Sequence, residues 1–226
     1  MPAFTQDVDC VGREQLPVRG RLLWDSLGAF EFEWVPRGDD QPPAEKYVWP
    51  NQRRPDVEIE FLVPIGPDDP RRTVQIQDKI VAQGLRNLDI LTDRPLEIRV
   101  DEGSPLAGEL VFRGTMSVPR VGHFAIQKGL IHEGRNREQR IKDVAYVFDL
   151  LDGGNGLADR VLEDVLAARE PWGDAVERFR TLIRARLDDH RFMLQVAAQF
   201  PVEGGATPRY IREEVAGWLR RFDSFG

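Results

Sequence analysis

The sequence has a single cysteine, Cys10, and only three histidines in 226 residues. One cysteine cannot form an internal disulfide, and the same count excludes zinc sites built from several cysteines. His123 and His132 are nine residues apart, too far to meet on one turn of a helix, and "HEGRN" departs from the His-Glu-x-x-His pattern of zinc hydrolases. We therefore interpret Cys10 as a small apolar filler of the core and do not expect a zinc enzyme.

Long apolar runs are also missing. No stretch approaches the roughly 18 to 20 consecutive apolar residues of a membrane span, and the N-terminus lacks a basic segment followed by an apolar one. The net charge of −7 argues against a broadly basic nucleic-acid-binding surface, although it permits local basic patches. Neither a Gly-x-Ser-x-Gly motif nor a phosphate loop ending in Gly-Lys-Ser/Thr is present. We expect a globular, cytoplasmic protein of one large or two small domains.

Short stretches of alternating apolar residues occur up to about residue 118, between segments rich in proline, glycine and aspartate. A period of two is typical of β-strands with one buried face. The segments 36–46 and 64–72 are predicted to be exposed turns, and 79–91 is predicted to be a short helix followed by a strand. Strands are expected at 4–12, 29–35, 56–64, 72–77, 95–100 and 109–118.

From about residue 119 onward the apolar residues follow a helical period. A proline opens the first of these segments, 119–132, and a double glycine ends the second, which begins at residue 137. Further helices are predicted at 157–169, 173–187, 189–199 and 208–222. The sequence therefore predicts an α+β protein: an N-terminal mixed β-sheet domain over 1–118, followed by a C-terminal helical bundle over 119–226.

Two of the predicted strands carry acidic residues at alternate positions. Residues two apart on a strand project from the same face, so Asp7 and Asp9 share one face. The stretch "DVEIEF" repeats the pattern with Asp56, Glu58 and Glu60, while its apolar residues point the other way. If the two strands are neighbours, the carboxylates converge and a hard divalent cation is the natural partner, Mg²⁺ by default or Mn²⁺. Alternatively, each acidic row is the solvent-facing side of an antiparallel sheet.

The same stretches resemble a known family. "FTQDVDCV" at 4–11 resembles the Thr-x-Asp-hydrophobic-Asp strand of the nucleotidyltransferase superfamily with the polymerase-beta-type fold, especially its AbiEii-like bacterial group. "VEIEFLVP" at 57–64 resembles the later strand that carries the third carboxylate. "HFAIQKGLIHEGRNREQRIKDVAYVFDLL" at 123–151 is similar to the family's Lys…Arg…Lys-Asp helical segment. The resemblance thus runs from residue 4 to about residue 151.

The resemblance implies roles for the acidic residues. Asp7 and Asp9 would hold metal ions that bridge the phosphates of a nucleoside triphosphate. Glu60 would complete the catalytic site and help to deprotonate the acceptor hydroxyl, and Glu58 is the alternative third acid because it shares the face. The implied reaction moves a nucleotide to a hydroxyl of a protein, an RNA or a small molecule. Some members are toxins of toxin–antitoxin pairs, so an antitoxin partner is also implied.

Basic residues in the third stretch suggest a phosphate contact. Lys128, Arg135 and Lys142 are predicted to attract nucleotide phosphates or an RNA backbone. The alternative interpretation is a solvated helix face on which Asp143 pairs with a neighbouring base.

Two other functions stay open at this point. The family carries a Gly-Gly or Gly-Ser turn before its first carboxylate strand, and the six residues before Asp7 contain none. The chain would then be N-terminally incomplete, or a degenerate, non-catalytic binding module. A metal-dependent nuclease is the other alternative, with Asp56, Glu97 and Arg99 as an approximate Pro-Asp…Glu-x-Lys set in which arginine replaces lysine.

Overall fold

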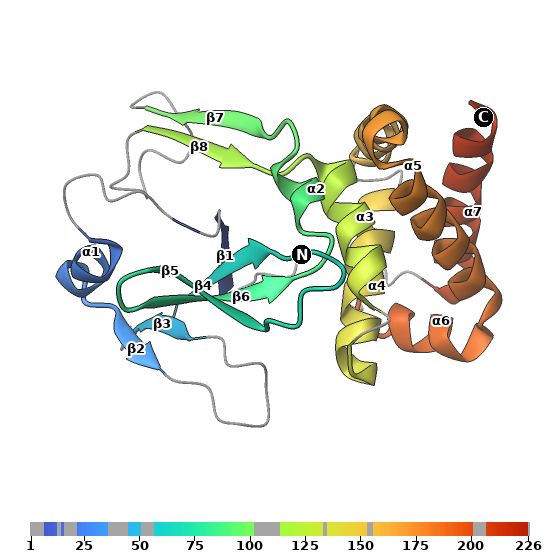
Figure 1. Cartoon of the computed structure of the whole chain (residues 1–226). Helices are drawn as coiled ribbons and strands as arrows, with labels where there is room; N and C mark the ends of the chain where they lie inside the picture. Colours follow the sequence, from blue (N-terminus) through green and yellow to red (C-terminus); the bar gives the residue numbers. More distant parts are fainter. Residues whose placement is uncertain are drawn as a thin grey trace. The chain divides into compact units, whose positions relative to one another are not determined.

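The computed structural model of the chain forms two compact units, Met1–Asp89 and Ile90–Gly226 (Figure 1). The sequence places a domain boundary after residue 118, where the apolar residues change from a strand period to a helical one. The two units are defined by contacts in space instead, so this boundary stays a prediction. The residues that the structure describes are 7–12, 15, 22–35, 45–50, 57–101, 114–132, 135–152, 156–200 and 207–225.

The first unit is built on a six-stranded mixed sheet, as predicted for the N-terminal part. Its central strand, β4, runs parallel to β1 and β6 and antiparallel to β3. The strand order is β2-β3-β4-β6-β5, with β1 also paired to β4. The strands are β1 (Asp7–Val11), β2 (Glu33–Val35), β3 (Lys46–Trp49), β4 (Val57–Pro64), β5 (Thr73–Gln77) and β6 (Ile80–Leu85).

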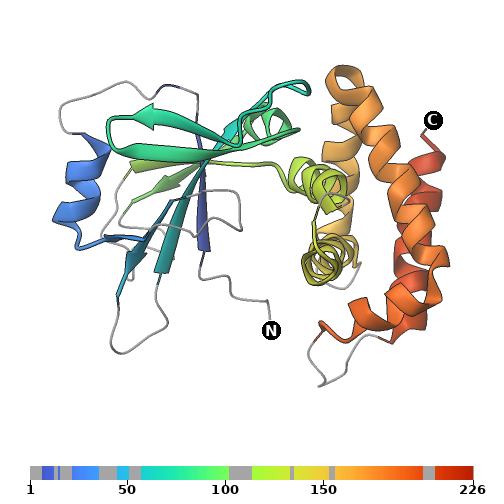
Figure 2. The ribbon, with the colours of Figure 1, turned by 60° about the horizontal axis from the view of Figure 1, so that its bottom comes forward.

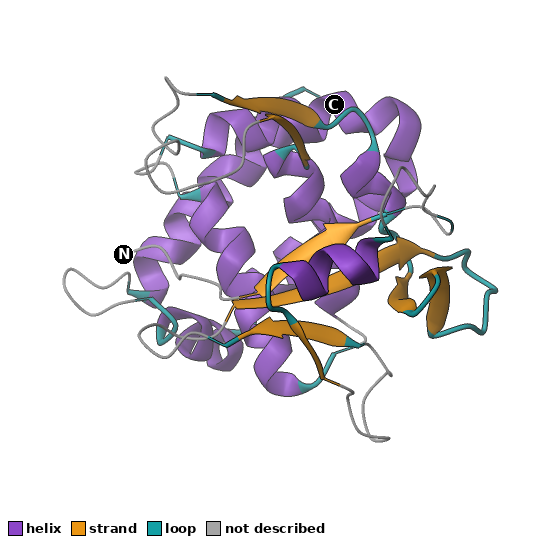
Figure 3. Ribbon diagram, turned by 90° about the vertical axis from the view of Figure 1, so that its left-hand side faces the viewer, coloured by secondary structure: helices purple, strands orange, loops and turns teal. Residues whose placement is uncertain are grey.

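A short helix, α1 (Leu23–Ala29), covers the apolar face of this sheet (Figure 3). Leu27 of the helix packs with Phe61 of β4 and with Tyr47 of β3, which is only 1% exposed. The sequence did not reveal α1, because its N-cap residue, Leu22, has no side chain that could cap the helix. The predicted strand over 29–35 is therefore wrong in its first half, where the helix ends and the chain turns.

The predicted order of elements over 79–91 is also wrong. The strand β6 comes first, and the short helix α2 (Asp89–Thr92) follows it. β6 pairs with β5 across a turn in which Lys79 has a φ of 58°. Ile80 and Ala82 are fully buried in this hairpin. Tertiary burial of alternate residues thus overrides a pattern that also fits a helix.

The second unit contains a helical bundle, as predicted for the C-terminal part, and a two-stranded antiparallel sheet whose strands were predicted for the N-terminal domain. The bundle core consists of apolar residues from all five helices, among them Ile126, Phe148, Val165, Met193 and Trp218. No helix within the described ranges has the length and apolar composition needed to cross a membrane. The elements are β7 (Leu96–Val100), β8 (Gly114–Val118), α3 (Val121–Ile131), α4 (Arg137–Leu151), α5 (Ala158–Asp188), α6 (His190–Ala197) and α7 (Pro208–Asp223).

Side-chain caps define where several of these helices begin. Asn136 accepts a hydrogen bond from the Gln139 N–H at 3.0 Å at the start of α4. Thr207 does the same for α7, where Pro208 occupies the first turn. Such residues satisfy N–H groups that have no partner inside the helix. They explain why the starts of these helices could be predicted from the sequence.

Helix α5 joins two segments that were predicted as separate helices, 157–169 and 173–187 (Figure 2). Pro171 lacks the N–H that would continue the hydrogen-bond ladder, and Trp172 leaves helical geometry at φ −131° and ψ 30°. The indole of Trp172 donates a hydrogen bond to Asp93 at 3.0 Å. The proline therefore bends the helix and does not end it.

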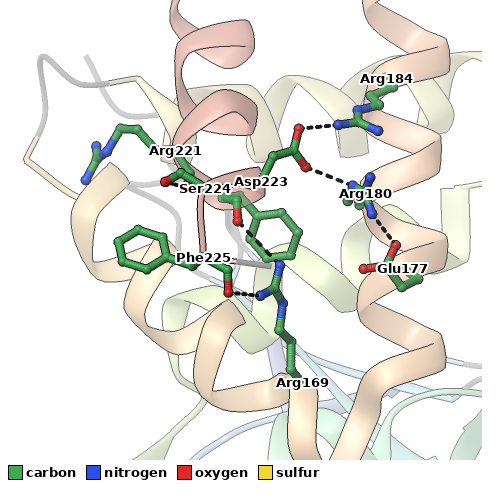
Figure 4. Close-up of polar contacts among 9 residues, drawn as sticks. Arg169, Glu177, Arg180, Arg184, Arg221, Asp223, Ser224 and Phe225 are labelled. Atoms are coloured by element: carbon green, nitrogen blue, oxygen red, sulfur yellow. Dashed lines mark hydrogen bonds and ion pairs between the residues drawn. The ribbon is translucent and has the colours of Figure 1, made fainter.

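The C-terminal end of α7 is tied to α5 by charged contacts (Figure 4). Asp223 pairs with Arg180 at 3.0 Å and also with Arg184. Arg169 donates hydrogen bonds to the carbonyl oxygens of Phe222 and Phe225. A guanidinium at the end of a helix also interacts favourably with the negative end of the helix dipole.

A substitution of Gly129 tests the packing of α3 on α5. An added Cβ would lie 2.5 Å from Cδ2 of Phe179, a fully buried ring, so Gly129→Ala should destabilise the protein by more than about 1 kcal/mol. In α7 the nearest atom to a Cβ on Gly217 is 3.7 Å away, and Gly217→Ala should stabilise by about 0.5 to 1 kcal/mol. Urea unfolding of both variants measures the difference, and equal effects would contradict the packing.

The pH dependence of stability tests the burial of His123 in α3. Burial of the imidazole lowers the pKa of His123, since the charged form loses its hydration. The folded state therefore favours neutral histidine, so this contribution is present above the unfolded pKa of about 6.5 and is lost as pH falls below it. Between about pH 7 and about pH 5, urea unfolding should show a smaller loss of stability in His123→Phe than in the wild type. His190→Gln, a change at an exposed histidine, should keep the wild-type slope.

Candidate active site

Two acidic strands lie side by side in the first unit. β1 pairs with β4 in a parallel register that aligns Asp7 with Glu58 and Asp9 with Glu60. Aligned residues of paired strands occupy the same face of a sheet, as do residues two apart along one strand. The backbone register therefore assigns all four acidic positions to one face, although the two strands are far apart in the sequence.

The acidic face continues onto β3. The antiparallel register aligns Lys46 with Glu60 and Val48 with Glu58, which puts Lys46 on the acidic face. The Lys46 Nζ contacts the Glu58 Oε1 diagonally across the two strands. Asp9 is exposed, while Glu58 and Glu60 are half-buried. The face thus combines exposed and half-buried carboxylates with an ammonium group.

The carboxylates fit a hard divalent cation by their chemistry. Mg²⁺ and Mn²⁺ prefer oxygen ligands, and Asp9, Glu58 and Glu60 offer them from neighbouring strands. Among the described residues, no three histidine, cysteine, aspartate or glutamate side chains are grouped closely enough to hold an ion. The donors therefore have the right type and register, but their side chains do not form a ready-made coordination set.

The opposite face of β1 has a different character. Cys10 is partly buried there and packs against the apolar core that contains Phe61. Burial, together with the charge of the adjacent Asp9, raises the pKa of the Cys10 thiol. The thiol is therefore protonated at neutral pH, which agrees with a packing role.

The predicted phosphate-binding residues belong to the second unit. Lys128 of α3 and Arg135 lie 3.5 Å and 3.2 Å from the two carboxylate oxygens of Asp143, which is 3% exposed. Lys128 and Lys142 both approach the ring of Tyr146, at 6.0 Å and 5.8 Å from its centroid. Two of the three basic residues thus have a buried counter-ion, and Lys142 is exposed. Their role in phosphate binding stays a prediction.

The residues of the nuclease hypothesis are only partly described. Asp56 lies outside the described residues. Glu97 of β7 accepts a hydrogen bond of 2.5 Å from the Ser117 hydroxyl of β8. Arg99 lies 3.6 Å from Asp101, and both side chains are exposed. The nuclease stays an alternative prediction.

A family comparison adds to this geometry. The model of a family described as "Nucleotidyltransferase" matches residues 1–152, about two thirds of the chain. The chain belongs to this nucleotidyltransferase family. The match includes both acidic strands of the nucleotidyltransferase and the segment that carries Lys128 and Asp143. It supports nucleotidyl transfer from a nucleoside triphosphate as the general reaction. Neither the curated proteins nor the solved structures gave a match.

Sequence reasoning missed one residue of the acidic face in this nucleotidyltransferase. Lys46 was assigned to the end of a predicted turn segment, 36–46, whereas it is the first residue of β3. The sequence signal for this strand was the stretch "KYVW", which is rich in aromatic and β-branched residues. In the structure Tyr47 is buried and its neighbours are more exposed. A strand of four residues is too short for this signal to stand out from turn composition.

The buried ion pairs of Asp143 give a stability prediction. Asp143→Asn leaves Lys128 and Arg135 without their counter-ion, and we expect a loss of about 1 to 3 kcal/mol because the two basic side chains keep partial access to water. Asp159 pairs with Arg221 at the surface, where its side chain is 75% exposed, so Asp159→Asn should cost less than about 0.5 kcal/mol. Urea unfolding at neutral pH compares the two, and similar losses would contradict the buried role.

Proposed function

We propose that this nucleotidyltransferase uses divalent metal ions, with Mg²⁺ as the default and Mn²⁺ as a substitute, to move a nucleotide to a hydroxyl acceptor. The acceptor is a hydroxyl of a protein, an RNA or a small molecule. The observation that carries the proposal is the parallel register of two acid-x-acid strands on one sheet face. Membership in a nucleotidyltransferase family supports it independently.

The proposed site divides its work between the two strands. Asp7 and Asp9 would hold the metal ions, and Glu60 would complete the set. Glu60 would accept the proton of the acceptor hydroxyl as its oxygen bonds to the α-phosphorus, while the bond to the β-phosphate breaks and pyrophosphate leaves. Divalent ions in such a site stabilise negative charge on the phosphate oxygens. Carboxylates from neighbouring strands are suited to this role, since the sheet fixes their backbones while the side chains can reorient onto an ion.

Lys128, Arg135 and Lys142 are proposed to contact the triphosphate or an RNA backbone. The ion pairs with Asp143 hold the side chains of Lys128 and Arg135 in defined positions. Exposed Lys142 adds positive charge on the same segment. A contact of this kind makes binding of the triphosphate dependent on ionic strength.

We also propose a subgroup within the nucleotidyltransferases for this protein. The stretches "FTQDVDCV" and "VEIEFLVP" support an AbiEii-like relationship, and with it a cytoplasmic toxin that has an antitoxin partner. An antitoxin would be expected to limit access to the acidic face or to the triphosphate. Co-expression with the product of a neighbouring gene would test this part separately.

Substitutions of the carboxylates test the proposed reaction. Asp9→Asn and Glu60→Gln should each lower the transfer of label from an α-labelled triphosphate by at least about a hundredfold, because several kcal/mol of charge stabilisation are lost. Glu163→Gln is the matched control: Glu163 belongs to α5 of the helical bundle and its side chain is 70% exposed, so activity should stay at the wild-type level.

The same preparation distinguishes the non-catalytic alternative. Calorimetric titration with Mg²⁺ and each triphosphate should give binding that Asp9→Asn abolishes. An absence of both binding and transfer in the wild type would contradict the proposal and favour a degenerate module. Cleavage of plasmid DNA or RNA by the same protein with Mg²⁺ would favour the nuclease.

A further inference from the structure

A cavity of about 420 Å³ lies in the second unit, where α3 meets α5. Leu130 of α3 and Leu182 of α5 form its apolar part and are 6% and 9% exposed. This volume falls within the range of small-molecule sites, roughly 300 to 1,000 Å³. The other lining residues all belong to α5: Glu177, Arg178, Thr181, Ala185 and Arg186.

Arg186 is held in place from two sides. Its Nε and Nη2 atoms lie 3.2 Å and 3.0 Å from Nε2 of His132, and its guanidinium carbon lies 5.0 Å from the centroid of the Phe192 ring. Nδ1 of the fully buried His132 lies 2.7 Å from the carbonyl oxygen of Gly129. A carbonyl only accepts and a guanidinium only donates, so the proton of the imidazole is on Nδ1, and Nε2 accepts from Arg186. The histidine that holds Arg186 is therefore neutral and does not balance its charge.

The lining of this cavity carries an excess of positive charge. In the part of the chain that the structure describes, no carboxylate forms an ion pair with Arg178 or Arg186. The acidic residue of the lining, Glu177, accepts a hydrogen bond of 2.5 Å from Nη1 of Arg180 (Figure 4), so its charge is already balanced. A fixed guanidinium next to an apolar surface is stabilised when an anion pairs with it.

We propose that this cavity binds a small organic anion whose head group is a carboxylate or a phosphate. The N–H donors of Arg186 that do not point to His132 pair with oxygens of the head group, since a guanidinium matches either group in shape. The apolar body of the ligand covers Leu130 and Leu182, and Arg178 adds positive charge at the rim. The site is separate from the proposed nucleotidyl transfer, and the inference does not depend on that reaction.

The arrangement favours a small ligand over a long polyanion. The contacts with His132 and Phe192 hold Arg186 before any ligand arrives, so its side chain loses less entropy on binding. The apolar part of the cavity is formed by aliphatic side chains, which offer no aromatic ring for a nucleobase to stack on. The net charge of −7 also disfavours a polymer of phosphates across the surface.

A fluorescence titration of the full chain with anilinonaphthalene sulfonate, an anionic dye with an apolar body, tests the site. One dye should bind per chain, and neutral phenylnaphthylamine, which lacks the sulfonate, should bind at least about tenfold more weakly. Phenyl phosphate and phenylacetate are then added as competitors. Displacement of the dye by one or both of them shows which head group the site accepts.

Two variants connect the binding to the lining residues. Arg186→Met should weaken dye binding by at least about tenfold, because the charge that pairs with the sulfonate is lost. Ala185→Leu keeps every charge but fills part of the cavity from an exposed position, and should weaken binding by about fivefold or more. Arg160→Met is the matched control, since Arg160 lies on the same helix outside the lining and its side chain is 50% exposed. It should bind the dye as the wild type does.

Several results would overturn the proposal. These are a wild type that binds no dye, equal binding of the neutral dye, no displacement by either phenyl anion, and wild-type binding in Arg186→Met or in Ala185→Leu. Thermal unfolding of each variant checks that the fold is kept. If Arg186→Met does not fold, Ala185→Leu and the neutral dye still decide the outcome.

Discussion

The parallel pairing of β1 with β4 is the constraint on which the candidate site depends. Parallel neighbours cannot be joined by a tight turn, so the chain must cross over between them. Here the crossover contains α1, β2 and β3. Helix α1 covers the apolar face of the sheet, which leaves the acidic face of β4 on the other side. One connection thus creates both the core and the place where carboxylates from distant parts of the chain are aligned.

The two faces of this sheet separate apolar packing from charge. Phe61 and Cys10 are on the core side, while Glu60 and Asp9 alternate with them on the other side. A shift of the register by one residue would turn the acidic row into the core, at a large cost in desolvation. The burial of the apolar row therefore holds the acidic row in place. In this way, hydrophobic packing positions groups that would otherwise repel one another.

The second unit contains buried aspartates whose charges must be balanced inside the protein. Asp143 is buried in the helical bundle, where its two basic neighbours balance its charge. Asp164 is also buried, and it accepts hydrogen bonds from Arg120 and from the backbone N–H of Gly122 at the start of α3. Both aspartates therefore join helices that are separate in sequence. Charged residues in this unit specify how helices meet, while the apolar core supplies most of the burial.

The sequence by itself determined the α+β class and several helix starts, because alternation, helical period and capping residues act over a few neighbouring positions. It also determined that Asp7 and Asp9 share a face, and likewise Glu58 and Glu60. Only the tertiary structure decided that these two rows are aligned, and that Lys46 contacts Glu58 across β3 and β4. It also decided that Pro171 bends a continuous helix. Strand partners and register depend on burial against distant segments, and no local pattern carries that information.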